Sequence, residues 1–289
     1  MTHFATFSIV ACDLADQAWG VAVASKFPAA GARVPWVAVG GAIATQSYAN
    51  TSFGPRGLRL LAEDTSADET LALLLAEDPD REQRQVGIVD AQGRSATFSA
   101  KECLPWAGGL SGEGYAIQGN ILTGRDVVAA MEEAFVHTAG DLGDRLMAAL
   151  LAGDRAGGDR RGRQSAGLLV AKPKAGYGGF DDIWLDYRVD DDPDPVPRLA
   201  HLLDLHRLYF GKSPKEDELA IEGEVARRLQ MLLSRLGFYS GPVSGAYDDS
   251  TRAALEAFIG NENFEDRTDF KSGRIDRPIF EHLMDKYAA

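Results

Sequence analysis

The first half of the chain alternates short apolar runs with turn residues, a pattern that predicts β-strands. In the opening run every second residue from Phe7 shares one face, and every second residue from Thr6 shares the other. The first strand therefore places hydroxyl groups at its head, on the face opposite Phe7. The predicted strands cover residues 5–11, 18–25, 33–39, 41–46, 84–90, 94–99 and 114–119.

Leucine at helical spacing over residues 55–77 predicts helix, and Ser66 followed three residues later by Glu69 is a capping-box signal that divides this stretch in two. Apolar positions also repeat at helical spacing in later segments. These later helices are expected at 124–137, at 140–152 and, starting after Pro195, through Leu208, and strands are expected at 165–171 and 183–189. Mostly antiparallel strands combined with segregated helices predict an α+β fold.

The character of the chain changes after residue 211. Residues 212–222 are polar and predict a linker between a domain at 1–211 and a smaller domain at 223–289. Helical spacing returns around 225–236, 251–259 and 278–287, so the smaller domain is expected to be all-α.

Composition excludes several classes of protein. The 289 residues are 45% hydrophobic and 25% charged, as is usual for a globular protein. A net charge of −13 argues against nucleic acid as the main partner, because phosphate binding needs a clustered basic surface. The sequence contains no run of 18 apolar residues, so no membrane-spanning helix is predicted. It also lacks a basic segment followed by an apolar one near its start, so no signal peptide is predicted. The expected location is the cytoplasm.

Cofactor and metal sites are not predicted. Cys12 and Cys103 are far apart and are expected to be buried and reduced. His201 and His206 lie five residues apart on a helix, whereas metal ligands are usually three or four apart, and His3, His137 and His282 form no ligand pattern either. The acidic stretch 190–194 lacks the glycine and alternating ligands of a calcium loop, so helix capping is its expected role.

Many segments, in order, resemble one bacterial family, the uncharacterised family of unknown function 1028. They are Thr6–Ala11, Val21–Phe27, Ala44–Asn50, Phe53–Gly57, Gln85–Asp90, Gln118–Asn120, Gly157–Ala166 and Arg188–Asp191. The resemblance covers roughly residues 4–210. That family is grouped with the N-terminal nucleophile hydrolases, so the resemblance implies a four-layer αββα sandwich, and a homo-oligomer because related hydrolases pack through their helical layers.

The end of the chain resembles a different module, the peptidoglycan-binding helical domain. The similar segments are Val225–Gln230, Leu236–Gly245 and Thr251–Phe258, although Ser244-Gly245 stands where that module usually has Asp-Gly. This second resemblance implies a peptidoglycan fragment as a partner.

The first resemblance implies Thr6 as the nucleophile. In this class of hydrolase the hydroxyl of the first residue attacks an amide carbonyl and its own α-amine is the base. Five residues precede Thr6 in this sequence, so its nitrogen is an amide unless the Ala5–Thr6 bond is cleaved. Thr2 is a second residue that processing could expose. The alternative is that Thr6 is a β-branched strand residue with no chemical role.

Other catalytic roles follow from the same resemblance. Lys26 would lower the pKa of the nucleophile, Ser25 would supply a second hydroxyl, and Ser165 is similar in position to a serine near the nucleophile. Asn50 and Asn120 would donate to the oxyanion. The alternatives are a solvated lysine and turn residues.

Ligand contacts are expected from Gln46, Tyr48, Gln118 and Arg163. Arg163 belongs to a glycine- and arginine-rich loop that would hold a carboxylate or phosphate of the substrate. The alternative is that its arginines pair with the aspartates of the stretch 190–194.

Two functions therefore remain open. The first is hydrolysis of an amide bond in a small or cell-wall-derived peptide or amide. The second is binding of a ligand or peptidoglycan fragment on the same scaffold without turnover. A free amine at Thr6 distinguishes the first from the second.

Overall fold

The computed structural model describes residues 6–211 and 213–288. Contacts divide the chain into two compact units, one ending at Leu203 and the other beginning at Asp204. The first unit is mixed α/β with antiparallel sheets, and the second is mainly helical.

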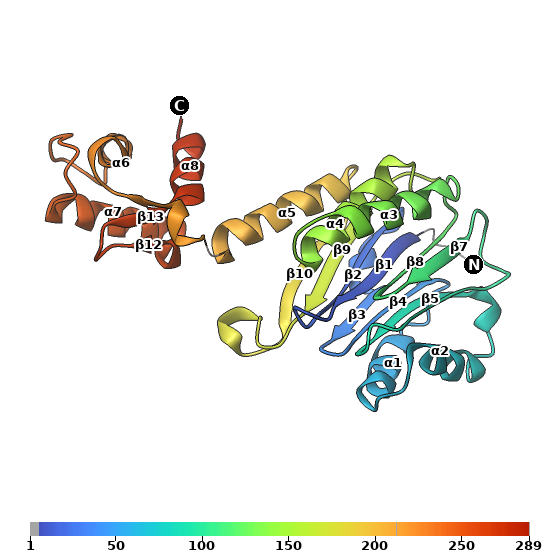
Figure 1. Ribbon diagram of the computed structural model, residues 1–289. Helices are drawn as coiled ribbons and strands as arrows, with labels where there is room; N and C mark the ends of the chain where they lie inside the picture. Colours follow the sequence, from blue (N-terminus) through green and yellow to red (C-terminus); the bar gives the residue numbers. More distant parts are fainter. Residues whose placement is uncertain (1–5, 212, 289) are drawn as a thin grey trace. The chain divides into compact units, whose positions relative to one another are not determined.

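The larger sheet of the first unit has six antiparallel strands in the order β10-β9-β2-β1-β8-β7. Its strands are β1 (Thr6–Asp13), β2 (Ala18–Ser25), β7 (Gly108–Gly112), β8 (Tyr115–Asn120), β9 (Ser165–Ala171) and β10 (Ile183–Val189). One face is covered by helices (Figure 1), namely α3 (Asp126–His137), α4 (Leu142–Arg155) and the start of α5 (Pro195–Phe210). Apolar residues fill this interface, among them Phe7, Ile9, Met131, Leu146 and Leu199.

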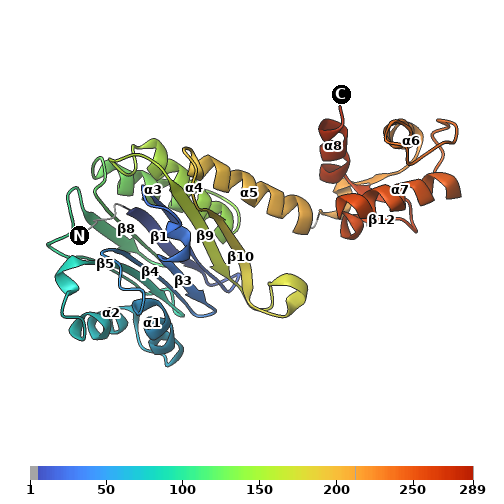
Figure 2. The ribbon, with the colours of Figure 1, turned by 180° about the vertical axis from the view of Figure 1, so that it is seen from behind.

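The smaller sheet lies against the other face of the larger one. Its four strands run in the order β3-β4-β5-β6, with bounds β3 (Pro35–Ala38), β4 (Gly41–Ser47), β5 (Arg84–Asp90) and β6 (Ser95–Ser99). Val10, Val21, Ala44 and Val89 are among the side chains packed between the sheets. Helices α1 (Phe53–Ala62) and α2 (Ala67–Ala76) cover the outer face of the smaller sheet (Figure 2).

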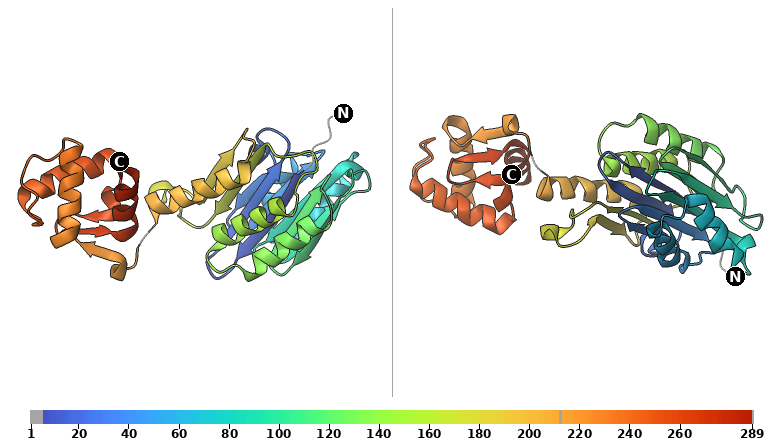
Figure 3. Two further views of the ribbon diagram at one scale, coloured as in Figure 1. Left: turned by 90° about the horizontal axis from the view of Figure 1, so that it is seen from above. Right: turned by 60° about the horizontal axis from the view of Figure 1, so that its bottom comes forward.

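The second unit combines three helices with a small sheet (Figure 3). The helices are α6 (Gly223–Arg235), α7 (Asp249–Glu262) and α8 (Arg277–Lys286), and the strands pair in the order β11 (Glu218–Ala220), β13 (Arg274–Asp276) and β12 (Thr268–Asp269). The helices agree with the sequence-based expectation, but the expectation of an all-α unit misses the sheet. Strands of two or three residues are too short to show a periodic pattern.

Short 3₁₀ turns complete the described chain, at Ala30–Ala32, Arg81–Gln83, Tyr177–Gly179, Lys215–Asp217 and Glu265–Arg267. The capping box that separates α1 from α2 is present, because the Glu69 amide donates to Ser66 Oγ at 3.3 Å. Strand β7 was missed, because three of its five residues are glycine. Across the residues described here, no helix has both the length and the apolar character that a membrane span requires.

Carboxamide side chains replace aliphatic ones at one end of the interface between the two sheets. Gln46 on β4, Gln85 on β5 and Gln118 on β8 are each no more than 1% exposed. Gly87 provides the space for one of them, since a Cβ at this position would lie 2.1 Å from Gln118 Oε1. The glycine therefore lets a side chain of the larger sheet reach the backbone of the smaller one.

Gly87→Ala is expected to lower the free energy of unfolding by about 2 kcal/mol, because the added methyl must displace a buried amide. Urea unfolding of the full chain measures the change. Gly124→Ala is the matched control, since a Cβ there meets nothing within 4 Å. Equal stability of the two variants would contradict the close approach.

Candidate active site

Four polar residues form a row across the larger sheet. Thr6 pairs with Asn120 on β8 and with Ser25 on β2, and Ser25 pairs with Ser165 on β9. Directly opposed residues of antiparallel strands project from the same face, so the four side chains share the face that meets the smaller sheet. All four residues are buried, at 3% exposure or less. The pairing of strands thus brings together four of the residues selected from the sequence.

The two hydroxyls at the centre of the row are in contact. Thr6 Oγ1 lies 3.2 Å from Ser25 Oγ, and either oxygen can donate the hydrogen bond. Hydroxyls in contact can pass a proton from one to the other, which is the chemistry needed to activate one of them as a nucleophile.

The carboxamide side chains behind this row have fixed orientations. Gln85 Nε2 donates to the Gly119 carbonyl at 2.7 Å and to Ser99 Oγ at 2.6 Å, so the other end of the Gln85 amide is an acceptor. Gln85 Oε1 accepts from Gln46 Nε2 at 2.9 Å and from Asn120 Nδ2 at 2.8 Å. The Gly119 carbonyl can only accept, so it fixes which end of the Gln85 amide is the nitrogen. Gln85 Oε1 in turn requires that Gln46 and Asn120 each turn their amide nitrogen toward it.

Ser8 completes this network on the first strand. Its hydroxyl donates to Gln46 Oε1 at 2.7 Å and accepts from Gln118 Nε2 at 2.6 Å. Gln46 Nε2 also approaches the carbonyls of Gln118 at 3.2 Å and Thr6 at 3.4 Å. Gln46 and Gln118, expected to contact a ligand, are joined by these hydrogen bonds to both sheets, and Gln46 also lines a pocket.

Among the described residues, Asn120 has one polar side-chain atom without a partner. Its Nδ2 donates to Gln85 Oε1, whereas its Oδ1 is buried and has no hydrogen-bond partner in that part of the chain. Asn120, expected to donate to an oxyanion, pairs with Thr6 across the sheet and carries a buried acceptor, its Oδ1. A buried acceptor without a donor is costly, so a donor group at this position would be stabilised.

Thr6 and Ser25 open onto a pocket of about 340 Å³. Its walls are largely apolar, and Tyr48, expected to contact a ligand, is among them. The other lining residues are Phe27, Ala30, Arg33, Val34, Gln46, Ser47, Ala49 and Thr51. We refer to it as the threonine pocket.

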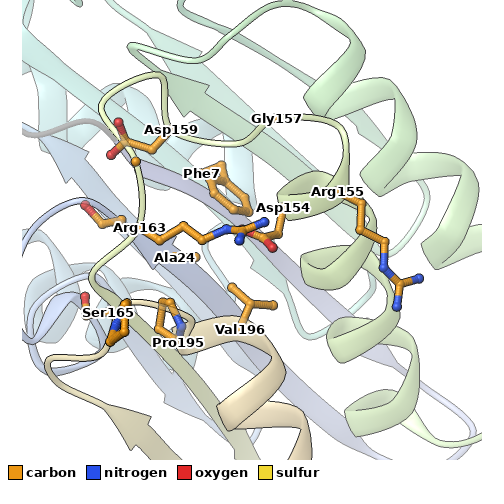
Figure 4. A pocket seen from close by; sticks show the side chains of 13 residues that line it. Phe7, Ala24, Asp154, Arg155, Gly157, Asp159, Arg163, Ser165, Pro195 and Val196 are labelled. Atoms are coloured by element: carbon orange, nitrogen blue, oxygen red, sulfur yellow. The ribbon is translucent and has the colours of Figure 1, made fainter.

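A second pocket, of about 420 Å³, is lined by Phe7 and Ala24, whose side chains face the helices. Figure 4 shows Arg163 crossing it with its guanidinium beside Asp154, while Arg155 points away. Arg163 Nε lies 2.7 Å from Asp154 and Nη1 lies 3.2 Å from Asp194. One ion pair therefore joins Arg163 to the acidic stretch, as the structural alternative for this loop predicted.

Lys26 and Ser165 hold the loops around the row. The Lys26 amide donates to Asp159 at 2.7 Å, and its ammonium donates to the Arg163 carbonyl at 3.2 Å. Ser165 Oγ donates to the Phe27 carbonyl at 2.5 Å and accepts from the Ala30 amide at 3.0 Å. Ser165 thereby fixes the turn that forms one wall of the threonine pocket.

Asn50 is bound to a buried ion pair. Its Nδ2 donates to Asp78 at 3.0 Å, and Asp78 accepts from Arg84 Nε at 2.7 Å. Arg84 also donates to the Tyr48 carbonyl at 2.7 Å, so the pair supports the loop that carries Tyr48. The hydrogen bond from Arg84 lowers the pKa of Asp78 to about 2.

Sequence reasoning missed Ser8, Gln85 and the pair Asp78–Arg84 as parts of the site. The available signal was the presence of polar residues inside otherwise apolar strands, such as Gln85 before Val86.

Cys12 and Cys103 are buried, and burial raises the pKa of Cys12 to about 12. Within residues 6–211 and 213–288, no three His, Cys, Asp or Glu side chains gather as a metal site would require.

The fold and the polar row define an α/β protein with two facing antiparallel sheets and a buried hydroxyl pair at one end. Residues 6–199 match the model described as "Family of unknown function (DUF1028)", and the chain belongs to this family. A crystal structure of a Silicibacter pomeroyi protein from the same family model is similar to it. That protein is 27% identical with a TM-score of 0.64, and the match covers 77% of this chain and 92% of that one.

Residues 209–283 match a second model, described as "Putative peptidoglycan binding domain". Among curated proteins, none matches the chain.

Asp78→Asn is expected to remove a pH-dependent part of the stability. The pKa of Asp78 is lowered in the folded state, so its contribution is complete above the unfolded value near 4 and is lost as pH falls through about 2. Urea unfolding between pH 7 and pH 2 should show a loss of about 2 kcal/mol in the parent chain that the variant lacks.

At pH 7 the same variant should be about 3 kcal/mol less stable, because Arg84 stays buried without its buried carboxylate and keeps only the longer, exposed pair with Asp80. Glu77→Gln is the control, since its pair with Arg56 is largely exposed and should contribute less than about 1 kcal/mol. If the stability of Asp78→Asn depended on pH in the same way as that of the parent, ionised Asp78 would not be the source of the pH-dependent stability.

Proposed function

We propose that the first unit hydrolyses an amide bond in a small or cell-wall-derived peptide or amide, by the mechanism of N-terminal nucleophile hydrolases. In this proposal, α3 and α4 form the first layer of the αββα sandwich of that class, the two sheets form the middle layers, and α1 and α2 form the fourth layer. The observation that carries it is that Thr6 lines a pocket, that its hydroxyl contacts Ser25, and that its strand partner Asn120 has an acceptor without a partner among the described residues.

The mechanism requires that Thr6 have a free α-amine. In the proposed activation, Thr6 Oγ1 attacks the carbonyl carbon of Ala5 and gives up its proton, the peptide C–N bond breaks, and the nitrogen takes a proton. Water then hydrolyses the resulting ester, leaving a carboxylate on Ala5 and an amine on Thr6. Residues 1–5, including the alternative Thr2, lie outside the described residues.

Turnover follows from the same groups. The Thr6 hydroxyl attacks the substrate carbonyl while its proton moves to the α-amine, directly or through Ser25. The departing amine takes that proton as the C–N bond breaks, leaving an acyl ester on Thr6. Water hydrolyses the ester, and the sum is amide plus water giving acid plus amine. In the charged state of the α-amine, Asn120 Oδ1 would accept one of its hydrogens.

Thr6→Ala is expected to abolish both removal of residues 1–5 and covalent labelling, because both need the hydroxyl. Intact mass of the purified full chain measures the first, and mass gain with a β-lactone probe measures the second. Thr138→Ala is the matched control, since Thr138 follows α3, lines neither pocket and should leave both results unchanged. Processing or labelling that survives in Thr6→Ala would exclude this nucleophile.

Substitutions of Asn120 are expected to move the pKa of the Thr6 α-amine in opposite directions. Asn120→Leu removes an acceptor from the charged amine and should lower its pKa by about one unit, whereas Asn120→Asp adds a negative charge and should raise it. The pH dependence of acetylation of the Thr6 amine, followed by peptide mass, gives both values. A shift in the same direction for both variants would indicate a structural effect only.

A second candidate function is binding without turnover. The match of residues 209–283 to a peptidoglycan-binding model favours capture of a peptidoglycan fragment by the second unit. Co-sedimentation of the full chain with insoluble peptidoglycan tests it, and Thr6→Ala should bind as the parent does. Binding without any processing at Thr6 would favour this function for the whole chain, and absence of binding would remove it.

A further inference from the structure

The threonine pocket has an unusual distribution of charge for so acidic a protein. The chain carries 43 acidic side chains against 30 basic ones, yet among the described residues no aspartate or glutamate lines this pocket. Within the same part of the chain, Arg33 is the single charged residue in its lining. The other pocket differs, because Asp154, Asp159 and Arg163 all line it and their charges are paired within the protein.

The Arg33 side chain is exposed, and among the described residues no carboxylate forms an ion pair with its guanidinium. It follows the short turn Ala30–Ala32, and its carbonyl accepts from Trp36 Nε1 at 3.2 Å, which fixes the backbone at this point. An arginine that the protein leaves unpaired beside an apolar cavity is suited to bind a carboxylate through its planar guanidinium.

The apolar walls and the volume define the rest of the ligand. Phe27, Val34 and Tyr48 supply aromatic and branched surfaces, and about 340 Å³ is at the small end of the range for ligand pockets. Such a cavity holds a compact apolar group rather than a long chain. Thr6 lines this pocket and not the other one, so the group that becomes attached to Thr6 is the group that this pocket must hold.

We propose that the substrate is an amide whose acyl half carries a compact apolar group and a carboxylate, the carboxylate being bound by Arg33. This inference rests on the proposed hydrolysis at Thr6. The amide C–N bond is broken by water, the acyl half leaves as a dicarboxylate, and the other half leaves as an amine. Arg33 acts as a specificity-determining residue and takes no part in proton transfer.

Turnover tests the inference with two matched compounds that differ by one charge. The first is the mono-4-nitroanilide of 1,4-phenylenediacetic acid, and the second is the methyl ester of the same compound. The acid should have a KM about two- to fivefold lower than the ester at low salt, the range of an exposed charge pair, and the ratio should shrink at high salt. In Arg33→Gln the ratio should approach one, and Arg33→Lys should restore part of it.

Arg59→Gln is the control, because Arg59 is an exposed arginine of α1 that lines neither pocket and should keep the parent ratio. Equal KM values for acid and ester in the parent, or a ratio that persists in Arg33→Gln, would overturn the inference.

A binding measurement separates the inference from the proposed hydrolysis. Calorimetry with phenylacetate and phenylacetamide is carried out on the full chain carrying Thr6→Ala, with and without Arg33→Gln. Preference for phenylacetate that depends on Arg33 in the Thr6→Ala chain, together with a parent chain that hydrolyses neither anilide, would support the pocket assignment and reject the hydrolase. Hydrolysis without any preference for the carboxylate would reject the pocket assignment and leave the hydrolase in place.

Discussion

The buried hydrogen-bond network between the two sheets is the constraint on which the candidate site depends. Gln46, Gln85 and Gln118 exchange hydrogen bonds with Ser8, with one another and with backbone carbonyls of the larger sheet. Each amide is oriented by a carbonyl that can only accept, so reversing one amide would leave two buried groups unsatisfied. The network is uncharged, and its hydrogen bonds keep the same pattern over the pH range in which carboxylates titrate. It fixes the strand that begins with Thr6 relative to the smaller sheet.

The surroundings of the row are held by charges instead. Arg84 and Asp78 are buried together and support the loop that carries Tyr48, while Asp159 holds the backbone of Lys26. Burying an ion pair gains little net stability, but breaking one is costly, so these contacts specify loop positions more than they stabilise the fold. The row therefore contacts the uncharged amide network directly, while the ion pairs lie in the surrounding loops. Its environment is polar but largely uncharged.

The sequence was sufficient for the strands and helices of the first unit apart from β7, and it selected Thr6 and Ser25 as residues of one candidate site. It was insufficient where function depends on contacts between sheets. Gln85 looked like one polar residue in a strand, and nothing local indicated that it orients Asn120. Asn50 was selected because it follows a strand, but its partner Asp78 is 28 residues away in sequence. The small sheet of the second unit escaped because period-two alternation needs more than three residues.

The close approach of Gly87 to Gln118 has an evolutionary consequence. Because position 87 has no side chain, position 118 can hold a long amide that reaches across the interface, and neither choice is useful alone. Homologous chains that acquire a side chain at position 87 should therefore have a shorter residue at position 118. Correlated change at these two positions would mark the members of the family that lack the amide network, and with it the fixed orientation of the residue opposite Thr6.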